Sequence, residues 1–426
     1  MGYMPSLYGA TKAVLSIFAL GVASTAMLLY RYQRSLVYPS NFPAGSRTEV
    51  LTPDQFGIDD FEVIGLRTPD GEKLHAFLLE QRQSSQKEKE RGNSDEPNEV
   101  MARRPTVLFL HANAGNMGHR LPLAAVFYKR FGCNVLMISY RGYGLSTGEA
   151  SEVGIRIDAQ TALEYIRKHP ILKDTFVIAY GQSIGGAVAI DLASRNPTNV
   201  GALILENTFL SIPELIPHVL PPIRPFTFLC REYWPSGISI KKIGKQTPIL
   251  FLSGRKDELV PPLHMDTLYA RCQSNLKVWK QLEDGTHNDT CVKPGYFEAI
   301  GLFLATYIIQ HTKGGRVAAD AAMKVLSGSY QIFDNPKGGY QILSKSSHSS
   351  KPSSSSPLSR SYDNEESKTL NVQSASSASR PSSVTSGEWV EMTASDVLPS
   401  SENDIAPSLS VAPQDIASAS ARKEEL

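Results

Sequence analysis

Short runs of β-forming residues alternate with amphipathic stretches between residues 54 and 312, and this alternation limits the fold more than any other feature of the sequence. Such alternation is typical of a mostly parallel sheet covered by helices. Several central runs are continuously apolar, as expected for strands that are buried on both faces. The predicted strands are residues 61–65, 73–79, 106–110, 134–139, 176–180, 202–206, 248–253 and 277–282.

Helices are predicted between most of these strands, at residues 121–131, 154–168, 184–195, 263–273 and 296–311. No helix separates the first two strands, so we expect them to form an antiparallel edge of the sheet. The polar residues 81–104 predict a mobile insertion loop. The sequence therefore predicts one α/β domain over residues 54–312, with an eight-stranded sheet flanked by helices.

An uncharged apolar run covers residues 13–30, near the N-terminus. A helix of this length rises roughly 27 Å, close to the roughly 30 Å hydrocarbon core of a bilayer. A cleaved signal peptide has a shorter apolar region and a small-residue cleavage site, whereas this run continues into bulky and basic residues. We therefore predict a signal-anchor transmembrane helix over residues 1–34 and a linker over residues 35–53, with the orientation left open by nearly balanced flanking charges.

The region after the predicted domain is rich in serine, with 26 serines between residues 344 and 426. It has too few large apolar groups to offset its ordering entropy, so we predict a disordered tail over residues 313–426, which could bind protein partners. Two similar segments, residues 330–333 and 340–343, are interpreted as a chance repeat rather than docking peptides or sorting signals. The motif Lys423-Glu424-Glu425-Leu426 resembles a retention signal of the endoplasmic reticulum, which predicts that membrane as the location.

The composition excludes several classes of protein. A formal net charge of +1 argues against a nucleic-acid partner, because binding phosphates needs a basic surplus. The four cysteines show no CxxC spacing and are too few for a disulfide scaffold. Phosphate-loop, dinucleotide-binding and histidine–carboxylate metal motifs are absent from the sequence, so neither a cofactor nor a metal is predicted.

The strongest local motif is Gly181-Gln182-Ser183-Ile184-Gly185-Gly186, between a predicted strand and a predicted helix. A G-x-S-x-G motif in this setting predicts a nucleophile elbow, in which the serine occupies a strained turn at the carboxyl edge of the sheet. The alternative is that Ser183 only caps the helix. Its position between strand and helix favours a nucleophile.

A serine nucleophile needs a base and an acid that orients the base, and in this fold they follow in the order serine, acid, histidine. Asp257 follows the strand at residues 248–253, and His287 follows the last predicted strand. Both therefore lie at the same edge of the sheet as Ser183. Glu206, at the end of another strand, is the second candidate for the acid; Glu258 and Asp289 are weaker candidates.

An oxyanion hole completes such a site. One donor is predicted to be the backbone N–H of Ile184, directly after the nucleophile. The other is predicted to be the backbone N–H of Asn113, in the loop of residues 111–116. Ala112 stands where a glycine is usual in this loop, and alanine tolerates positive φ less well, so we expect a somewhat different loop shape.

Six blocks in this order, HANAGNMGHRLP, YRGYGLSTGEASE, GQSIGGAVAIDLAS, ENTFLSIP, SGRKDELVPP and DGTHNDT, resemble the Bem-like branch of the alpha/beta hydrolases over residues 55–310. The resemblance implies an alpha/beta-hydrolase fold and a membrane-anchored serine hydrolase, with Ser183, Asp257 and His287 in the triad positions. The chain departs from the family at Ala112, in the insertion at 81–104 and in its long tail, none of which touches the triad.

Residues 207–244 lie where such hydrolases insert a short cap, and they are rich in proline and bulky apolar residues. They form either a lid with an acyl-binding groove near the bilayer or simply part of the core. With the anchor, they favour a lipid ester or acyl thioester as substrate, although peptidases share this fold. The competing hypothesis is a membrane-tethered scaffold with a vestigial hydrolase fold and a partner-binding tail.

Overall fold

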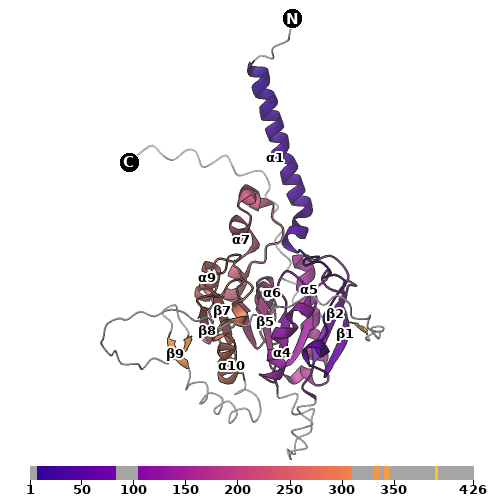
Figure 1. The fold of residues 1–426 in the computed structure, drawn as a ribbon, viewed down its shortest axis with the longest axis vertical. Coiled ribbons are helices and arrows are strands. Elements are labelled where there is room, and N and C mark those ends of the chain that lie inside the picture. The colour runs from indigo at the N-terminus through magenta and orange to yellow at the C-terminus, as the bar shows by residue number, and fades with distance from the viewer. Residues whose placement is uncertain (1–6, 83–103, 309–329, 335–339, 345–388, 392–426) are drawn as a thin grey trace, which may run out of the picture.

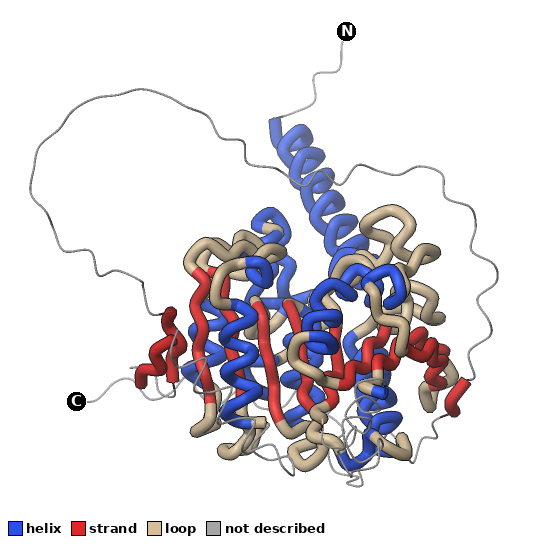
Figure 2. The backbone as a smooth tube through the Cα atoms, turned by 60° about the horizontal axis from the view of Figure 1, so that its bottom comes forward, coloured by secondary structure: helices blue, strands red, loops and turns tan. Residues whose placement is uncertain are grey.

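Helices cover both faces of one sheet in the computed structural model, which describes residues 7–82, 104–308, 330–334, 340–344 and 389–391 (Figures 1 and 2). All eight predicted strands are present, each within two residues of its predicted bounds. They are β1 (Phe61–Arg67), β2 (Lys73–Leu79), β3 (Thr106–Leu110), β4 (Asn134–Ile138), β5 (Val177–Gln182), β6 (Ala202–Glu206), β7 (Ile249–Gly254) and β8 (Lys277–Leu282).

The sheet order across these strands is β1-β2-β4-β3-β5-β6-β7-β8. From β4 to β8 all neighbours are parallel, while β2 is antiparallel to both β1 and β4. The predicted antiparallel edge is therefore confirmed. Because β5 to β8 are parallel, the loops that follow them share one edge of the sheet.

The five predicted helices form as α4 (Leu121–Lys129), α5 (Glu152–Lys168), α6 (Ile184–Arg195), α9 (Leu263–Arg271) and α10 (Tyr296–Tyr307). The core is divided by the sheet. Apolar side chains of α5, α6 and α9 pack on one face, and those of α4 and α10 pack on the other. Helix α6 is almost wholly buried, which explains its uninterrupted apolar sequence.

Three further strands come from the region predicted as a disordered tail: β9 (Tyr330–Asp334), β10 (Tyr340–Ser344) and β11 (Trp389–Glu391). Strand β10 pairs with β9 in an antiparallel hairpin and with β8 in parallel, and β11 pairs with β1. The two similar segments thus become one hairpin, because the open edges of a sheet offer backbone groups to any β-forming segment. The rest of the predicted tail, with the retention motif, lies outside the described residues, so its disorder and the endoplasmic-reticulum location stay predictions.

Helix α1 (Leu7–Val37) extends beyond residue 34, where the predicted anchor ends. Its segment Tyr8–Val37 is long and apolar enough to cross a membrane, with a mean hydropathy of 2.0, and none of its most apolar stretch is buried against the domain. The residues after it do not form a free linker. Tyr38 is buried and donates a hydrogen bond from its hydroxyl to Glu232 Oε2 at 2.8 Å. Arg34, in the last turn of α1, binds the same carboxylate, with Nε 3.0 Å from Glu232 Oε1.

The insertion loop begins later than predicted. Gln81 is only 2% exposed, and its side-chain amide donates to the carbonyls of Tyr128 and Cys133. It therefore belongs to the folded domain. Residues 83–103, the bulk of the predicted loop, lie outside the described residues.

Candidate active site

Ser183 lies on a strained turn between β5 and α6, as the motif predicts. Its backbone has φ of 55° and ψ of −119°, a conformation that costs an ordinary residue free energy. Hydrogen bonds hold the turn in place: the N–H of Ser183 donates to the Glu206 carbonyl at 2.9 Å, and Thr208 Oγ1 donates to the Ser183 carbonyl at 2.7 Å. Ser183 is thereby fixed at the carboxyl edge of the sheet.

Two glycines of the motif allow β5, α6 and the neighbouring loop to approach closely. A Cβ on Gly181 would lie 2.1 Å from the Gly185 carbonyl oxygen, and a Cβ on Gly185 would lie 2.1 Å from the Leu110 carbonyl oxygen. Leu110 ends β3 and precedes the loop predicted to hold the second oxyanion donor. The absence of a side chain at Gly185 thus sets the distance between the nucleophile and that loop.

Replacing Gly185 by alanine is expected to lower the free energy of unfolding by about 3 kcal/mol or more, because backbone rather than a movable side chain blocks the new methyl group. Denaturant unfolding of the full chain in detergent measures the change. The matched control is Gly301→Ala in α10, where the nearest atom is a Phe131 ring carbon at 3.2 Å and can move. Equal stability of the two variants would contradict the tight crossing.

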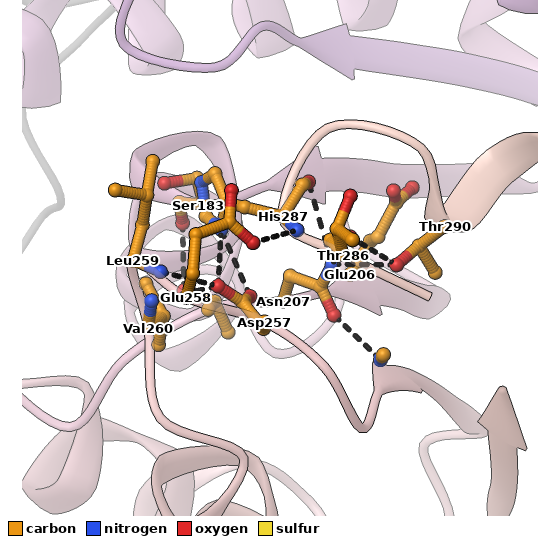
Figure 3. Close-up of polar contacts among 12 residues, drawn as sticks. Ser183, Glu206, Asn207, Asp257, Glu258, Leu259, Val260, Thr286, His287 and Thr290 are labelled. Atoms are coloured by element: carbon orange, nitrogen blue, oxygen red, sulfur yellow. Dashed lines mark hydrogen bonds and ion pairs between the residues drawn. The ribbon is translucent and has the colours of Figure 1, made fainter. Parts of the chain in front are cut away.

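Asp257 and His287 meet at the same edge of the sheet. Asp257 follows β7, His287 follows β8, and His287 Nδ1 lies 2.9 Å from Asp257 Oδ2 and 3.1 Å from Oδ1. Asp257 Oδ1 also accepts the backbone N–H groups of Leu259 and Val260, at 2.9 and 2.8 Å. Figure 3 shows this pair grouped with Ser183, each residue coming from a different loop.

The pairing sets the tautomer of His287. An ionised carboxylate only accepts hydrogen bonds, so Nδ1 must carry the proton that it donates to Asp257. Nε2 then has a free lone pair and can accept a proton from a hydroxyl group. Both side chains are almost completely buried, with 7% of the His287 and 1% of the Asp257 side chain exposed, which shields the pair from water.

Glu206, the second candidate for the acid, lies beneath the site and faces other partners. Its carboxylate accepts hydrogen bonds from the hydroxyls of Tyr180 and Tyr296, at 2.6 and 2.5 Å, and from Gln182 Nε2 at 3.2 Å. Burial raises the pKa of Glu206 above its ordinary value. Its direct contacts among the described residues do not include the His287 ring, so its geometry does not favour it as the orienting acid.

The two weaker acid candidates also contact other groups. Glu258 Oε2 accepts the backbone N–H of His287 at 3.2 Å, which positions the loop rather than the ring. Asp289 accepts the backbone N–H of Thr286 and pairs with Lys293 at 2.7 Å. The hydrogen bond from Lys293 is the largest cause that lowers the pKa of Asp289 to about 2.

One proposed oxyanion donor, Ile184, lies on α6, and the other, Asn113, lies in the loop after β3. Gly185 is where α6 and the end of β3 approach closely. Ile184 opens α6, so its N–H is one of the helix's unpaired donors. Asn113 follows β3, and the structure records no acceptor for its backbone N–H among the described residues. Ala112 is buried and is not one of the described non-glycine residues with positive φ, so the alanine introduces no backbone strain there.

The residues after α1 bind the loop that contains Asn113, which the sequence does not predict. Asn113 Nδ2 donates to the Val37 carbonyl at 2.5 Å, and Asn113 Oδ1 accepts from the Tyr143 hydroxyl at 2.8 Å. The N–H of Gly115 donates to the Phe42 carbonyl at 2.8 Å. The end of α1 and the segment after it therefore help to define the shape of this loop.

Asn207 is another residue whose role the sequence does not indicate. It has φ of 44° at the end of β6, and its side-chain nitrogen donates to the Thr286 carbonyl at 3.2 Å and to Thr290 Oγ1 at 2.9 Å. Its Oδ1 accepts the N–H of Gly254 at 2.8 Å. Asn207 thus ties the histidine loop to β7, and its position directly after a buried strand is the signal that could have identified it.

The described residues contain no group of three or more histidine, cysteine or acidic side chains that could hold a metal ion. His111, at the start of the loop of residues 111–116, is fully buried and donates from Nδ1 to the Ala112 carbonyl, while its Nε2 accepts the N–H of Tyr140. Burial lowers the pKa of His111 to about 3. This histidine is therefore neutral and structural.

Comparison with known proteins defines the class. The family profile described as alpha/beta hydrolase fold matches residues 105–226. An esterase from Pyrococcus furiosus has a TM-score of 0.50 at 18% identity, covering 62% of this chain and 98% of its own. An alpha-beta hydrolase from Vibrio vulnificus has the same TM-score at 20% identity, covering 64% and 92%. The sheet order and the strained serine turn are those of an alpha/beta hydrolase.

Relatives at higher sequence identity place the chain in one branch of the alpha/beta hydrolases. The chain is 48% identical to protein bem46 of Schizosaccharomyces pombe, over 70% of this chain and 92% of that protein. It is 40% identical to an uncharacterized membrane protein of Saccharomyces cerevisiae and 34% identical to the alpha/beta hydrolase domain-containing protein WAV2 of Arabidopsis thaliana, each over 68% of this chain and 94% of the relative. The chain belongs to the Bem46-like branch of the alpha/beta hydrolase superfamily.

Proposed function

We propose that this protein is a membrane-anchored serine hydrolase that cleaves acyl ester or thioester bonds. The observation that carries the proposal is the buried Asp257–His287 pair, at 2.9 Å, beside a serine on a strained turn. The fold and the family support a hydrolase. The apolar helix α1, together with a yeast relative described as a membrane protein, supports the anchor.

In the proposed reaction, Ser183 Oγ attacks the acyl carbonyl carbon while His287 Nε2 takes the hydroxyl proton. The N–H groups of Ile184 and Asn113 stabilise the negative oxygen of the tetrahedral intermediate. The intermediate collapses, and the departing alcohol or thiol takes the proton from His287. Water then attacks the acyl-enzyme with His287 again as base, which releases the acid and restores Ser183.

Asp257 contributes by orienting the base. Its carboxylate holds His287 Nδ1–H and stabilises the imidazolium that forms during each attack. The N–H groups of Leu259 and Val260 hold this carboxylate in turn. An amide could react in the same way with an amine as leaving group; we favour esters and thioesters because the anchor and the apolar cap place the site near lipid.

A fluorophosphonate probe tests the proposal, because it phosphonylates only activated serines. The full chain in detergent is expected to form one covalent adduct, mapped by mass spectrometry to the peptide that contains Ser183. The heat-denatured chain is the control and should remain unlabelled. Absence of the adduct in the native chain, or an adduct on another serine, would overturn the proposal and bring the scaffold hypothesis forward.

A further inference from the structure

An apolar groove lies between helix α1 and the cap. Within the cap, α7 (Ile212–Val219) and the 3-10 helix η4 (Pro221–Leu229) face the C-terminal half of α1. The groove is open to its surroundings and encloses about 70 Å³. Its apolar walls are formed by Leu29, Leu36 and Val37 of α1 and by Ile216, Ile223 and Phe226 of the cap.

The residues around the groove mark the boundary between lipid and water. Tyr30 and Tyr32 are about half exposed, and Arg231 of the cap stacks over the Tyr30 ring at 4.2 Å. Tyrosine and arginine concentrate at membrane interfaces. Phe228 of the cap is 74% exposed, and α1 and α7 project from the same side of the domain (Figure 1). The Leu29 end of the groove therefore lies at this boundary, next to the leaflet that α1 would enter.

Hydrogen bonds fix the two walls relative to each other. Gln33, a polar residue on the α1 wall, donates from Nε2 to the Leu229 carbonyl at 3.2 Å and accepts the N–H of Arg231 at 2.6 Å. Its amide is thus occupied by the cap rather than offered to a ligand. The groove consequently presents an almost wholly apolar surface, which suits a hydrocarbon chain and offers little to a charged ligand.

One end of the groove lies beside the loop that contains Asn113. Val37 lines the groove, and its carbonyl accepts the hydrogen bond from the Asn113 side chain. The backbone N–H of Asn113 is the proposed oxyanion donor. The groove extends along α1 from Val37 to Leu29, which is about 12 Å of helix, toward the membrane-spanning part.

We propose that this α1–cap groove binds the acyl chain of the substrate, which enters from the adjacent leaflet with its carbonyl directed toward Ser183. The inference rests on the proposed function and adds the chemical class of substrate: a long-chain acyl ester or thioester of a lipid or lipid-modified molecule. A long chain is favoured because each methylene that leaves water for the groove strengthens binding.

The test fills the groove from either wall. The full chain in phosphatidylcholine nanodiscs is assayed with p-nitrophenyl palmitate and p-nitrophenyl butyrate, and the ratio of the two kcat/KM values is measured. Leu29→Trp, and independently Ile223→Trp, is expected to lower the palmitate-to-butyrate ratio about tenfold or more, the effect of excluding two or more methylenes. Leu28→Trp is the matched control, since Leu28 adjoins Leu29 on α1 but does not line the groove.

A ratio that falls equally in all three variants, or in none, would overturn the groove as the acyl site. Failure of the proposed function looks different: the wild-type chain would hydrolyse neither ester and form no Ser183 adduct. In that case, crosslinking by a palmitate analogue with a terminal diazirine still tests whether the groove binds an acyl chain, because crosslinking needs no turnover. Crosslinks to α1 or cap peptides that Leu29→Trp removes and Leu28→Trp retains support the groove; absence of crosslinks overturns it.

Discussion

Replacing Ser183 by alanine is expected to lower kcat for ester hydrolysis by about a million-fold, because no other group can form the acyl-enzyme. His287→Ala should lower kcat by about the same factor. The double variant should lower kcat little further, since nucleophile and base act as one unit. The measurement is steady-state hydrolysis of a chromogenic ester by the purified full chain.

The matched control for this loss is Ser194→Ala. Ser194 is on the same helix α6, and its hydroxyl donates to the Asp191 carbonyl away from the site. This variant should keep the wild-type kcat. Ester hydrolysis by Ser183→Ala within tenfold of the wild type would exclude Ser183 as the nucleophile.

Asp257→Asn is expected to lower kcat by about ten-thousand-fold. Asparagine keeps the size of the side chain but can present an N–H group to His287 Nδ1, which favours the tautomer with the proton on Nε2. That tautomer cannot take the proton of Ser183. The loss is measured as kcat of the same chromogenic ester at neutral pH.

Comparing Glu206→Gln with Asp257→Asn shows which of the two acids orients His287. Glu206 contacts Tyr180, Tyr296 and Gln182 and does not contact the His287 ring, so kcat should stay within about tenfold of the wild type. If Glu206→Gln caused the larger loss and Asp257→Asn the smaller, Glu206 would be the orienting acid. Thermal unfolding of both variants checks that each remains folded.

The eight strands and five helices could be predicted because buried parallel strands and amphipathic helices leave periodic apolar patterns in the sequence. The placement of Ser183, Asp257 and His287 at one edge follows from chain order in a parallel sheet. These features depend on local sequence and on a topology with few alternatives.

The features that could not be predicted depend on contacts to backbone carbonyls far along the chain. Asn113 binds the Val37 carbonyl, and Asn207 binds the Thr286 carbonyl. Every residue except proline offers the same backbone groups, so nothing in the sequence identifies these partners. For the same reason the segment after α1 is predicted as a linker although it is hydrogen-bonded to the domain.

The attachment of this segment has a practical consequence for anyone who wishes to study the domain without its membrane helix. Removing the chain through Val37 would take away the carbonyl that Asn113 uses as an acceptor, and removing it through Glu49 would also take away the acceptors of Gly115 and Asn116. The loop of residues 111–116, which is proposed to supply an oxyanion donor, would then be free to change shape while the sheet stayed intact. A shortened, water-soluble version could therefore fold normally and still be inactive, and a negative result from it would say nothing about the whole enzyme.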